Sequence, residues 1–87
     1  MELIFYNSYT GEETVMSKVE TVSDITSVIN NYCEENNFKS YYLRTWEHEG
    51  NLVIDYGSHV NFFVVKPCTF DKWINMNNNE FTEENND

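Results

Sequence analysis

Three short stretches in the middle of the chain, SYYLRTWE, NLVIDY and VNFFVVK, constrain the fold more than any other feature of the sequence. Each is rich in aromatic or β-branched residues, and the separators HEG and GSH contain glycine. Stretches of this kind, joined by short glycine-containing loops, are typical of antiparallel strands. The sequence therefore predicts a three-stranded meander over residues 39–66.

The second loop lies within DYGSHVNFFV, residues 55–64, where an acid, a glycine and a histidine could also suggest a catalytic site. We interpret it as a turn, because a three-residue loop at 57–59 brings six apolar residues onto one side of the sheet. A two-residue loop would divide these residues between the two faces. The expected cross-strand pairs are Tyr56 with Val60, Ile54 with Phe62 and Leu52 with Val64.

The first loop, within HEG, predicts the register of the hairpin that it joins. A two-residue turn at Glu49 and Gly50 places opposite charges across from each other on the two strands. Such a pair is worth roughly 0.2–1 kcal/mol and specifies the register more than it adds stability. The expected pairs are Leu43 with Tyr56, Arg44 with Asp55 and Thr45 with Ile54.

Two strands and a helix are expected before the meander. Residues 2–7 and 14–20 form strands, joined by a turn in the segment YTGE at 9–12. Residues 23–36 form an amphipathic helix, because apolar residues recur there at intervals of three and four.

The expected helix has recognisable ends. Ser23 or Asp24 is the predicted N-cap, since short polar side chains accept hydrogen bonds from the first free N–H groups. Asn36 and Asn37 should end the helix, because asparagine tolerates the left-handed backbone common just past a helix.

The second face of the predicted meander is mixed, with Tyr42, Arg44, Trp46, Val53, Asp55, Asn61, Phe63 and Val65 as its members. One interpretation is that a short helix within TFDKWINM, which carries three apolar residues at helical spacing, covers part of this face. The other is that Tyr42, Trp46 and Phe63 form an exposed aromatic patch around Arg44. That composition is typical of protein-binding hot spots.

Together these elements predict an α+β fold: a β-hairpin, an α-helix, a three-stranded antiparallel meander and a short C-terminal helix. We expect one domain over residues 1–76. Residues 77–87 are acidic and rich in asparagine, with too little apolar content to pack against the domain, so they should fray or act as a solvated acidic arm. These patterns do not determine the order of strands across the sheet.

The charge of the chain restricts its partners. Fifteen acidic and five basic residues give a formal charge of −10, which repels phosphate backbones and anionic lipid headgroups. We therefore expect no direct binding to nucleic acid or membrane. The same field attracts basic protein surfaces, above all those that hold nucleic acid. A simpler interpretation is that acidity only keeps a small protein soluble.

The sequence also predicts the cellular location. No run of residues approaches the roughly 20 apolar positions needed to cross a bilayer, and the opening lacks the features of an export signal. We expect a cytoplasmic protein whose Cys33 and Cys68 are reduced and buried, since the two are far apart and outside any paired-ligand spacing.

No pattern in the sequence predicts a cofactor, a metal or a catalytic centre. His48 and His59 fall in loops at opposite ends of the middle strand, roughly 20 Å apart by strand rise, so they cannot share a metal ion. Cys33 is expected on the packed side of a helix, where a nucleophile would be inaccessible. Asp55 and His59 could imitate an acid–base pair, but no nucleophile or oxyanion donor can be assigned beside them. We expect a binding protein and no enzyme.

The segment LRTWEHEGNLVIDYGSHVNFFVV, residues 43–65, resembles small uncharacterised proteins encoded by phages and prophages of Gram-positive bacteria. In these proteins an aromatic-rich strand precedes a D-Y/F-G-S-H turn and a strand with two adjacent phenylalanines. Accessory genes of this kind include anti-CRISPR and anti-restriction proteins, many of which are compact, acidic and non-enzymatic.

The resemblance implies an inhibitor that binds a host nucleic-acid-binding protein, such as a CRISPR effector or a restriction factor. Its carboxylates would occupy a basic groove in place of phosphates. The candidate contacts are Glu12, Glu13, Asp24, Glu34, Glu35, Glu47 and Glu49, with Glu80, Glu83 and Glu84 in the tail. The alternative function is a protein-interaction module or a homodimer that uses Tyr42, Trp46 and Phe63, or an open sheet edge.

Overall fold

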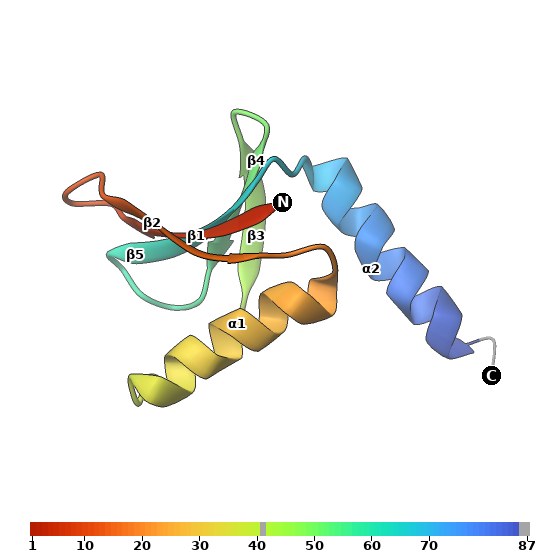
Figure 1. Ribbon diagram of the computed structural model, residues 1–87, viewed down its shortest axis with the longest axis horizontal. Helices are drawn as coiled ribbons and strands as arrows, with labels where there is room; N and C mark the ends of the chain where they lie inside the picture. The colour runs from red at the N-terminus through yellow and green to blue at the C-terminus, as the bar shows by residue number, and fades with distance from the viewer. Residues whose placement is uncertain (41, 86–87) are drawn as a thin grey trace.

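A computed structural model describes residues 1–40 and 42–85, with side chains up to residue 78. Its elements are β1 (Glu2–Asn7), β2 (Glu13–Lys18), α1 (Val22–Glu35), β3 (Arg44–His48), β4 (Asn51–Asp55), β5 (Asn61–Lys66) and α2 (Phe70–Asn85). Over these residues the strands form one antiparallel sheet in the order β2-β1-β5-β4-β3, and α1 packs against one of its faces (Figure 1). The predicted α+β class is confirmed.

Strand β1 joins the two halves of the sheet. It pairs with β2 on one side and with β5 on the other, where Leu3 lies opposite Val65 and Phe5 lies opposite Phe63. All four of these residues are apolar, so the two strands share one buried face. Local sequence patterns could not determine this pairing, because its partners are some 60 residues apart in the chain.

The β3–β4 hairpin has the predicted register. Arg44 lies opposite Asp55, and Thr45 lies opposite Ile54. The ion pair expected between the first two is present, with 2.9 Å between the Arg44 Nη2 and Asp55 Oδ2 atoms. The prediction is confirmed at this hairpin.

The turn of this hairpin explains why its register could be predicted. Glu49 and Gly50 have φ angles of 51° and 78°, both in the left-handed region. Two successive left-handed residues match the twist of the flanking strands, so a turn of this kind fixes the loop at two residues. Strand β3 begins only at Arg44, so the expected pair of Leu43 with Tyr56 lies outside the strands.

The β4–β5 register differs from the prediction by one residue. Ile54 lies opposite Phe63, where the sequence predicted Phe62, and Leu52 lies opposite Val65. The predicted pairing was therefore wrong, because the loop contains one residue more than expected. Since side chains alternate along a strand, the shift exchanges the two faces of β5.

Side chains of the loop stabilise its greater length. The Ser58 hydroxyl accepts hydrogen bonds from the backbone N–H groups of Val60, at 3.2 Å, and of the next residue, at 3.0 Å. The Asp55 carboxylate accepts one from the N–H of Gly57, at 2.9 Å, and Gly57 has a φ of 107°. The bond from Val60 satisfies inside the loop a donor that the shorter loop would place in the strand ladder. Tyr56 and Val60 consequently belong to no strand and do not pair as expected.

Helix α1 is capped differently from the prediction. Its N-cap is Thr21, and Ser23 and Asp24 lie inside the helix. The Thr21 hydroxyl accepts a hydrogen bond from the Asp24 N–H at 3.0 Å, and the Asp24 carboxylate accepts one from the Thr21 N–H at 3.1 Å. This reciprocal arrangement satisfies two free donors at once, which neither predicted cap would do. The end at Asn36 is confirmed, and Asn37 has the left-handed φ of 53°.

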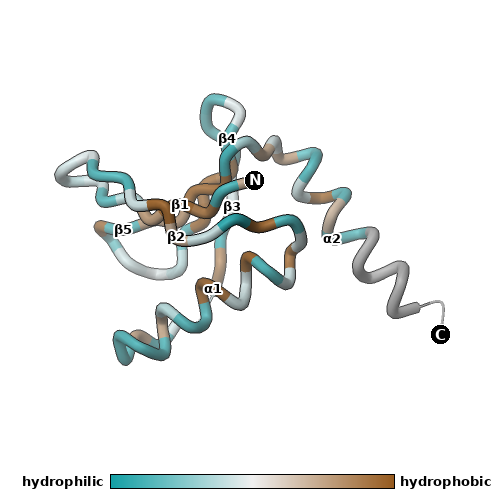
Figure 2. The backbone as a smooth tube through the Cα atoms, in the orientation of Figure 1, coloured by the Kyte–Doolittle hydropathy of each residue, from teal (hydrophilic) through white to brown (hydrophobic). Residues whose placement is uncertain are grey.

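The core lies between α1 and the sheet and is rich in aromatic rings. The ring of Tyr32, on α1, lies 4.8 Å from that of Phe5, 5.6 Å from that of Phe63 and 6.0 Å from that of Tyr56, measured between centroids. The last two contacts are edge to face, and pairs of this kind contribute about 0.5–1.5 kcal/mol each beyond simple burial. Figure 2 shows the most hydrophobic part of the chain around β1 at the centre of the molecule. The fully buried aliphatic residues of this core are Leu3, Val19, Ile25, Ile29, Leu52, Ile54 and Val65.

Helix α2 does not cover the second face of the sheet. Thr69 caps it by accepting a hydrogen bond from the Lys72 N–H at 3.2 Å, and Trp73 and Met76 pack against the core on the side of α1. From there the helix runs away from the sheet (Figure 1). The interpretation in which a C-terminal helix covers the mixed face is therefore wrong. The helix also continues to Asn85, beyond the segment predicted to be helical.

Candidate interaction groove

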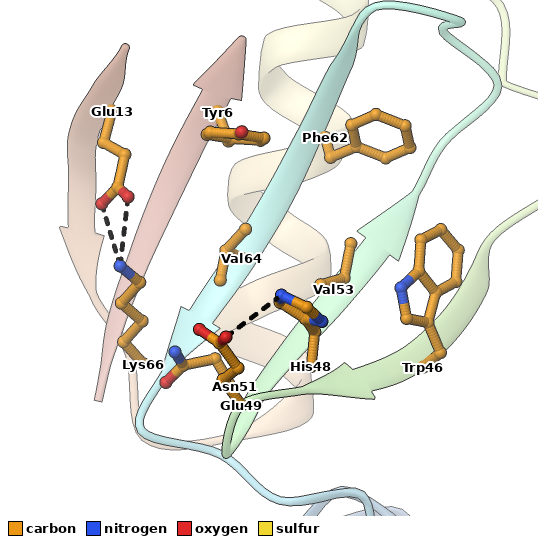
Figure 3. A pocket seen from close by; sticks show the side chains of 10 residues that line it. All are labelled: Tyr6, Glu13, Trp46, His48, Glu49, Asn51, Val53, Phe62, Val64 and Lys66. Carbon is orange, nitrogen blue, oxygen red and sulfur yellow. Dashed lines mark hydrogen bonds and ion pairs between the residues drawn. The ribbon is translucent and has the colours of Figure 1, made fainter. Parts of the chain in front are cut away.

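The face of the sheet opposite α1 carries a shallow groove of about 400 Å³ (Figure 3). Every second residue of a strand points to this face, so all five strands contribute side chains to it. None of the described side chains of α2 lines it. The lining residues are Tyr6, Glu13, Trp46, His48, Glu49, Asn51, Val53, Phe62, Val64 and Lys66.

The middle of the groove is apolar. Val64 lies opposite Val53 in the β4–β5 ladder, Phe62 lies opposite Tyr6 in the β1–β5 ladder, and Trp46 lies opposite Val53 in the β3–β4 ladder. The rings of Trp46 and Phe62 approach edge to face, with centroids 6.0 Å apart. Trp46 remains 41% exposed, so a large apolar ring faces solvent beside an apolar floor.

The margins of the groove are charged. The Lys66 ammonium donates to both Glu13 oxygens, at 2.9 and 3.2 Å, across one margin. Across another, the nearest oxygen of the Glu49 carboxylate is 3.9 Å from the His48 Nε2 atom, and this carboxylate is 82% exposed. The charges of Lys66 and Glu13 cancel, and the Glu49 carboxylate adds a further negative charge to the groove.

A buried aspartate lies just beyond the groove. Asp55 is only 5% exposed and accepts hydrogen bonds from the Arg44 guanidinium and from the Gly57 N–H, both at 2.9 Å. Burial alone would raise the pKa of Asp55, but these two hydrogen bonds and the guanidinium charge outweigh it and hold the pKa below its ordinary value. The pair therefore stays charged, and it fixes the end of β4 next to the groove.

The predicted aromatic patch of Tyr42, Trp46 and Phe63 is wrong in one member. Trp46 is in the groove, and Tyr42 is exposed beside Arg44, whose Cζ atom lies 5.5 Å from the tyrosine ring centroid. Phe63 is 0% exposed and belongs to the core. Phe62 lies on the exposed face, where the sequence predicted Phe63, because the longer loop exchanges the faces of β5. The signal for this was Ser58, a residue that commonly caps a longer turn through its hydroxyl.

Three of the predicted acidic contacts already have partners within the chain. Glu13 pairs with Lys66. Asp24 accepts hydrogen bonds from the N–H groups of Glu20 and of the N-cap residue, which lower its pKa. Glu47 accepts a hydrogen bond from the Phe70 N–H at 2.7 Å. For Glu13 and Glu47 these structural roles were not suggested by the sequence, whereas Asp24 was expected to accept hydrogen bonds at the start of the helix, although as its N-cap.

The remaining acidic candidates lie on separate elements. Glu12 is in the β1–β2 loop, Glu34 and Glu35 are exposed at the end of α1, and Glu49 is in the β3–β4 turn. Of the acidic candidates with described side chains, the groove brings together only Glu13 and Glu49. The side chains of Glu80, Glu83 and Glu84 lie outside the described residues.

The other candidate titratable side chains are either buried or exposed to solvent. Cys33 and Cys68 are buried and free, and burial raises the pKa of both thiols. Burial also raises the pKa of the Tyr56 hydroxyl, to about 12. His48 ends β3 and His59 lies exposed in the β4–β5 loop, at opposite ends of β4. Among the described side chains no three potential metal ligands of the His, Cys, Asp or Glu type come together.

Comparison with known proteins assigns no family to this chain. Within residues 1–40 and 42–85, neither helix combines the length and the apolar content needed to span a bilayer. Comparisons with protein-family models, curated proteins and solved structures find no match to this chain. The resemblance to phage and prophage accessory proteins therefore stays a prediction.

Proposed function

We propose that this protein is a non-enzymatic binding module that uses the groove on its uncovered sheet face to hold the basic surface of another protein. The observation that carries the proposal is the exposed, aromatic-lined groove formed by Trp46, Phe62 and Tyr6 over a floor of valines. An apolar surface left open on a small domain marks a site of association. Tryptophan and tyrosine are also the residues most enriched where partners bind tightly.

The charge of the chain favours a basic partner. At a net charge of −10, the protein repels nucleic acid and attracts cationic protein surfaces, which speeds encounter and selects the partner. A second copy is a poor occupant for the same reason, since two chains of charge −10 would meet face to face. A nucleic-acid-binding protein of a bacterial host meets these requirements and agrees with the resemblance to phage accessory proteins.

The groove is a better candidate contact than the carboxylates alone. Glu13, Asp24 and Glu47 are already hydrogen-bonded within the chain. Using them as phosphate mimics would compete with these bonds. In our proposal the acidic surface attracts and orients the partner, and the aromatic groove supplies the short-range contact.

The proposal can be tested with immobilised wild-type protein and two variants, exposed to a bacterial lysate at low salt. Trp46→Ala removes the groove ring, and Tyr9→Ala removes an 81% exposed ring from the β1–β2 loop as a matched control. We expect a partner that binds the wild type and Tyr9→Ala and is lost from Trp46→Ala. Titration calorimetry with that partner, purified, should show the same loss and a weaker affinity at higher salt.

Two results would overturn the proposal. One is an identified partner that binds Trp46→Ala as well as it binds the wild type, in a variant whose dispersed NMR spectrum shows that it is folded. The other is a sedimentation profile in which the wild type is a dimer and Trp46→Ala a monomer, because the occupant of the groove would then be a second copy.

A further inference from the structure

We propose that the outer edge of β3 receives an extended basic segment of the partner as an additional strand of the sheet, with a β-branched side chain of that segment packed on Trp46. This inference rests on the proposed function and names the form in which the partner binds. The observation that carries it is an edge strand whose outward backbone groups bond to no described residue, beside an exposed ring of the groove.

The backbone of β3 offers hydrogen-bonding groups to its outer side. Among the described strands β3 pairs only with β4, through a two-residue turn of left-handed residues. In such a hairpin the residues that flank the turn, His48 and Asn51, form a hydrogen-bonded pair, and bonded and non-bonded pairs then alternate along the ladder. The N–H and C=O groups of Thr45 and Glu47 therefore point away from β4, and no described residue bonds to them.

The opposite edge of the sheet is less suited to pairing. The ladder of β2 with β1 shifts register between Leu3 and Ile4, and an irregularity of this kind twists an edge away from an incoming strand. The ladder of β3 with β4 is regular along its length. The charged side chains of β3 are also engaged within the chain, since Arg44 pairs with Asp55 and Glu47 caps α2. The outer edge of β3 is therefore the better template for an added strand.

The exposed ring beside this edge favours an apolar residue of the partner. Trp46 is 41% exposed and meets Phe62 at 6.0 Å on the groove side of β3 (Figure 3). Side chains of an added strand alternate between the two faces of the sheet, so every second one would lie on the groove side. A valine or isoleucine across from the indole suits this position, because aromatic and β-branched side chains pair favourably across strands.

The open edge and the charge of the chain together define the occupant. Rows of N–H and C=O groups are complementary to another extended polypeptide, as in strand addition to a sheet edge. The net charge of −10 attracts a segment rich in lysine or arginine. A second copy would bring two chains of this charge edge to edge, and it is an outcome of the experiment below.

The experiment uses a capped heptapeptide, Ac-Lys-Val-Lys-Val-Lys-Val-Lys-NH2, which has the alternation and the charge of the inferred segment. It is titrated into the full-length ¹⁵N-labelled protein, and NMR measures the exchange of individual amides with water. We expect exchange at Thr45 and Glu47 to slow about twofold when half of the protein is bound, because only the free half then exchanges. Amides of β2 should keep their rates. The same peptide with every inner amide N-methylated should protect neither residue, because it cannot donate to the edge.

Two variants separate the backbone from the side chain. Thr45→Pro removes an N–H that makes no bond to β4, so the fold should survive, as prolines do at the outer side of edge strands. Protection of Glu47 by the peptide should be lost in this variant. Thr45→Val, the matched control, keeps the N–H and should retain the protection. A dispersed NMR spectrum checks the fold of both variants, and if Thr45→Pro does not fold, the N-methylated peptide still decides the outcome.

The inference is overturned if the heptapeptide slows neither amide, if the N-methylated peptide protects them equally, or if a folded Thr45→Pro binds like Thr45→Val. A wild type that sediments as a dimer and a Thr45→Pro variant that sediments as a monomer would also overturn it, because the added strand would then come from a second copy. A partner that is lost from Trp46→Ala but binds Thr45→Pro as well as the wild type would refute only the inference. A partner indifferent to Trp46→Ala would refute the proposed function itself.

Discussion

The carboxylate of Glu47 accepts a 2.7 Å hydrogen bond from the backbone N–H of Phe70, so a residue of the edge strand β3 caps the first residue of α2. The hydroxyl of Thr69 caps the same helix by accepting from the Lys72 N–H. The negative charge of the glutamate also complements the positive end of the helix dipole. Helix α2 is therefore tied to the sheet at its N-terminus by a side chain that is 23 residues away in the chain.

Replacing Glu47 by alanine should loosen α2. Loss of a capping acceptor costs about 0.5–2 kcal/mol of unfolding free energy, measurable by urea denaturation. Amide hydrogen exchange should rise most in the first turn of α2, because its N–H groups lose an acceptor there. Glu34→Ala, at an exposed site on α1, should leave both measurements nearly unchanged. Equal effects of the two substitutions would contradict the capping role.

The register of β5 predicts opposite effects at two adjacent phenylalanines. Phe63→Ala removes a fully buried ring and should cost about 3–5 kcal/mol of unfolding free energy. Phe62→Ala removes a partly exposed ring of the groove and should cost no more than about 1.5 kcal/mol. Urea denaturation of both variants measures the difference. The register first predicted from the sequence requires the reverse order of costs.

The Asp55 carboxylate should contribute to acid unfolding. Its pKa is lowered in the folded protein by the Gly57 N–H and by Arg44, which outweigh the opposing effect of burial. A depressed folded pKa means that the contribution is complete above the ordinary value of 3.8 and is lost as the pH falls below it. Asp55→Asn should lower the unfolding free energy at neutral pH by about 1 kcal/mol, since solvent screens the exposed arginine.

The Asp55→Asn variant also tests the direction in which this carboxylate makes stability depend on pH. Unfolding free energy measured from neutral pH down to pH 3 should fall less steeply in Asp55→Asn than in the wild type. Asp24, whose pKa is also lowered by hydrogen bonds from backbone N–H groups, should account for part of the slope that remains. Parallel pH profiles for the two proteins would refute the contribution of Asp55.

Alkaline pH should destabilise the protein through Tyr56. Burial raises the pKa of this hydroxyl from 10.0 to about 12, so the folded protein retains its proton where the unfolded chain loses it. Stability from this group is complete below the unfolded pKa and decreases as the pH rises from about 10 to about 12. Tyr56→Phe should flatten the alkaline stability profile, and Tyr9→Phe, at an exposed site, should not. Tyrosinate absorbance should show one fewer late-titrating group only in the first variant.

Sequence patterns predicted the parts of the fold that depend on neighbouring residues. The β3–β4 register followed from a two-residue turn that Gly50 makes favourable, and the end of α1 followed from the tolerance of Asn37 for a left-handed backbone. The order of the strands could not be predicted in this way. It depends on the pairing of β1 with β5, which is decided by burial of Leu3 and Phe5 against residues far along the chain.

The groove was only partly predictable for the same reason. The exposed position of Trp46 was predicted correctly, because a two-residue turn fixes the face on which it lies. Phe62 was missed, because hydrogen bonds to Ser58 and Asp55 lengthen the next loop and a loop one residue longer reverses the strand that follows. The structural role of Glu47 was missed because its acceptor function depends on where α2 begins in space.

The position of β1 between β2 and β5 sets the order in which this protein can fold. The β1–β2 hairpin can form as soon as its residues leave the ribosome, but the other edge of β1 must wait for Asn61–Lys66, which are made much later. Sheets closed by such distant partners form slowly, because loop-closure entropy is lost before the contacts are gained. The groove, whose walls come from both halves of the chain, therefore requires both the early hairpin and the late strand β5 to be in place.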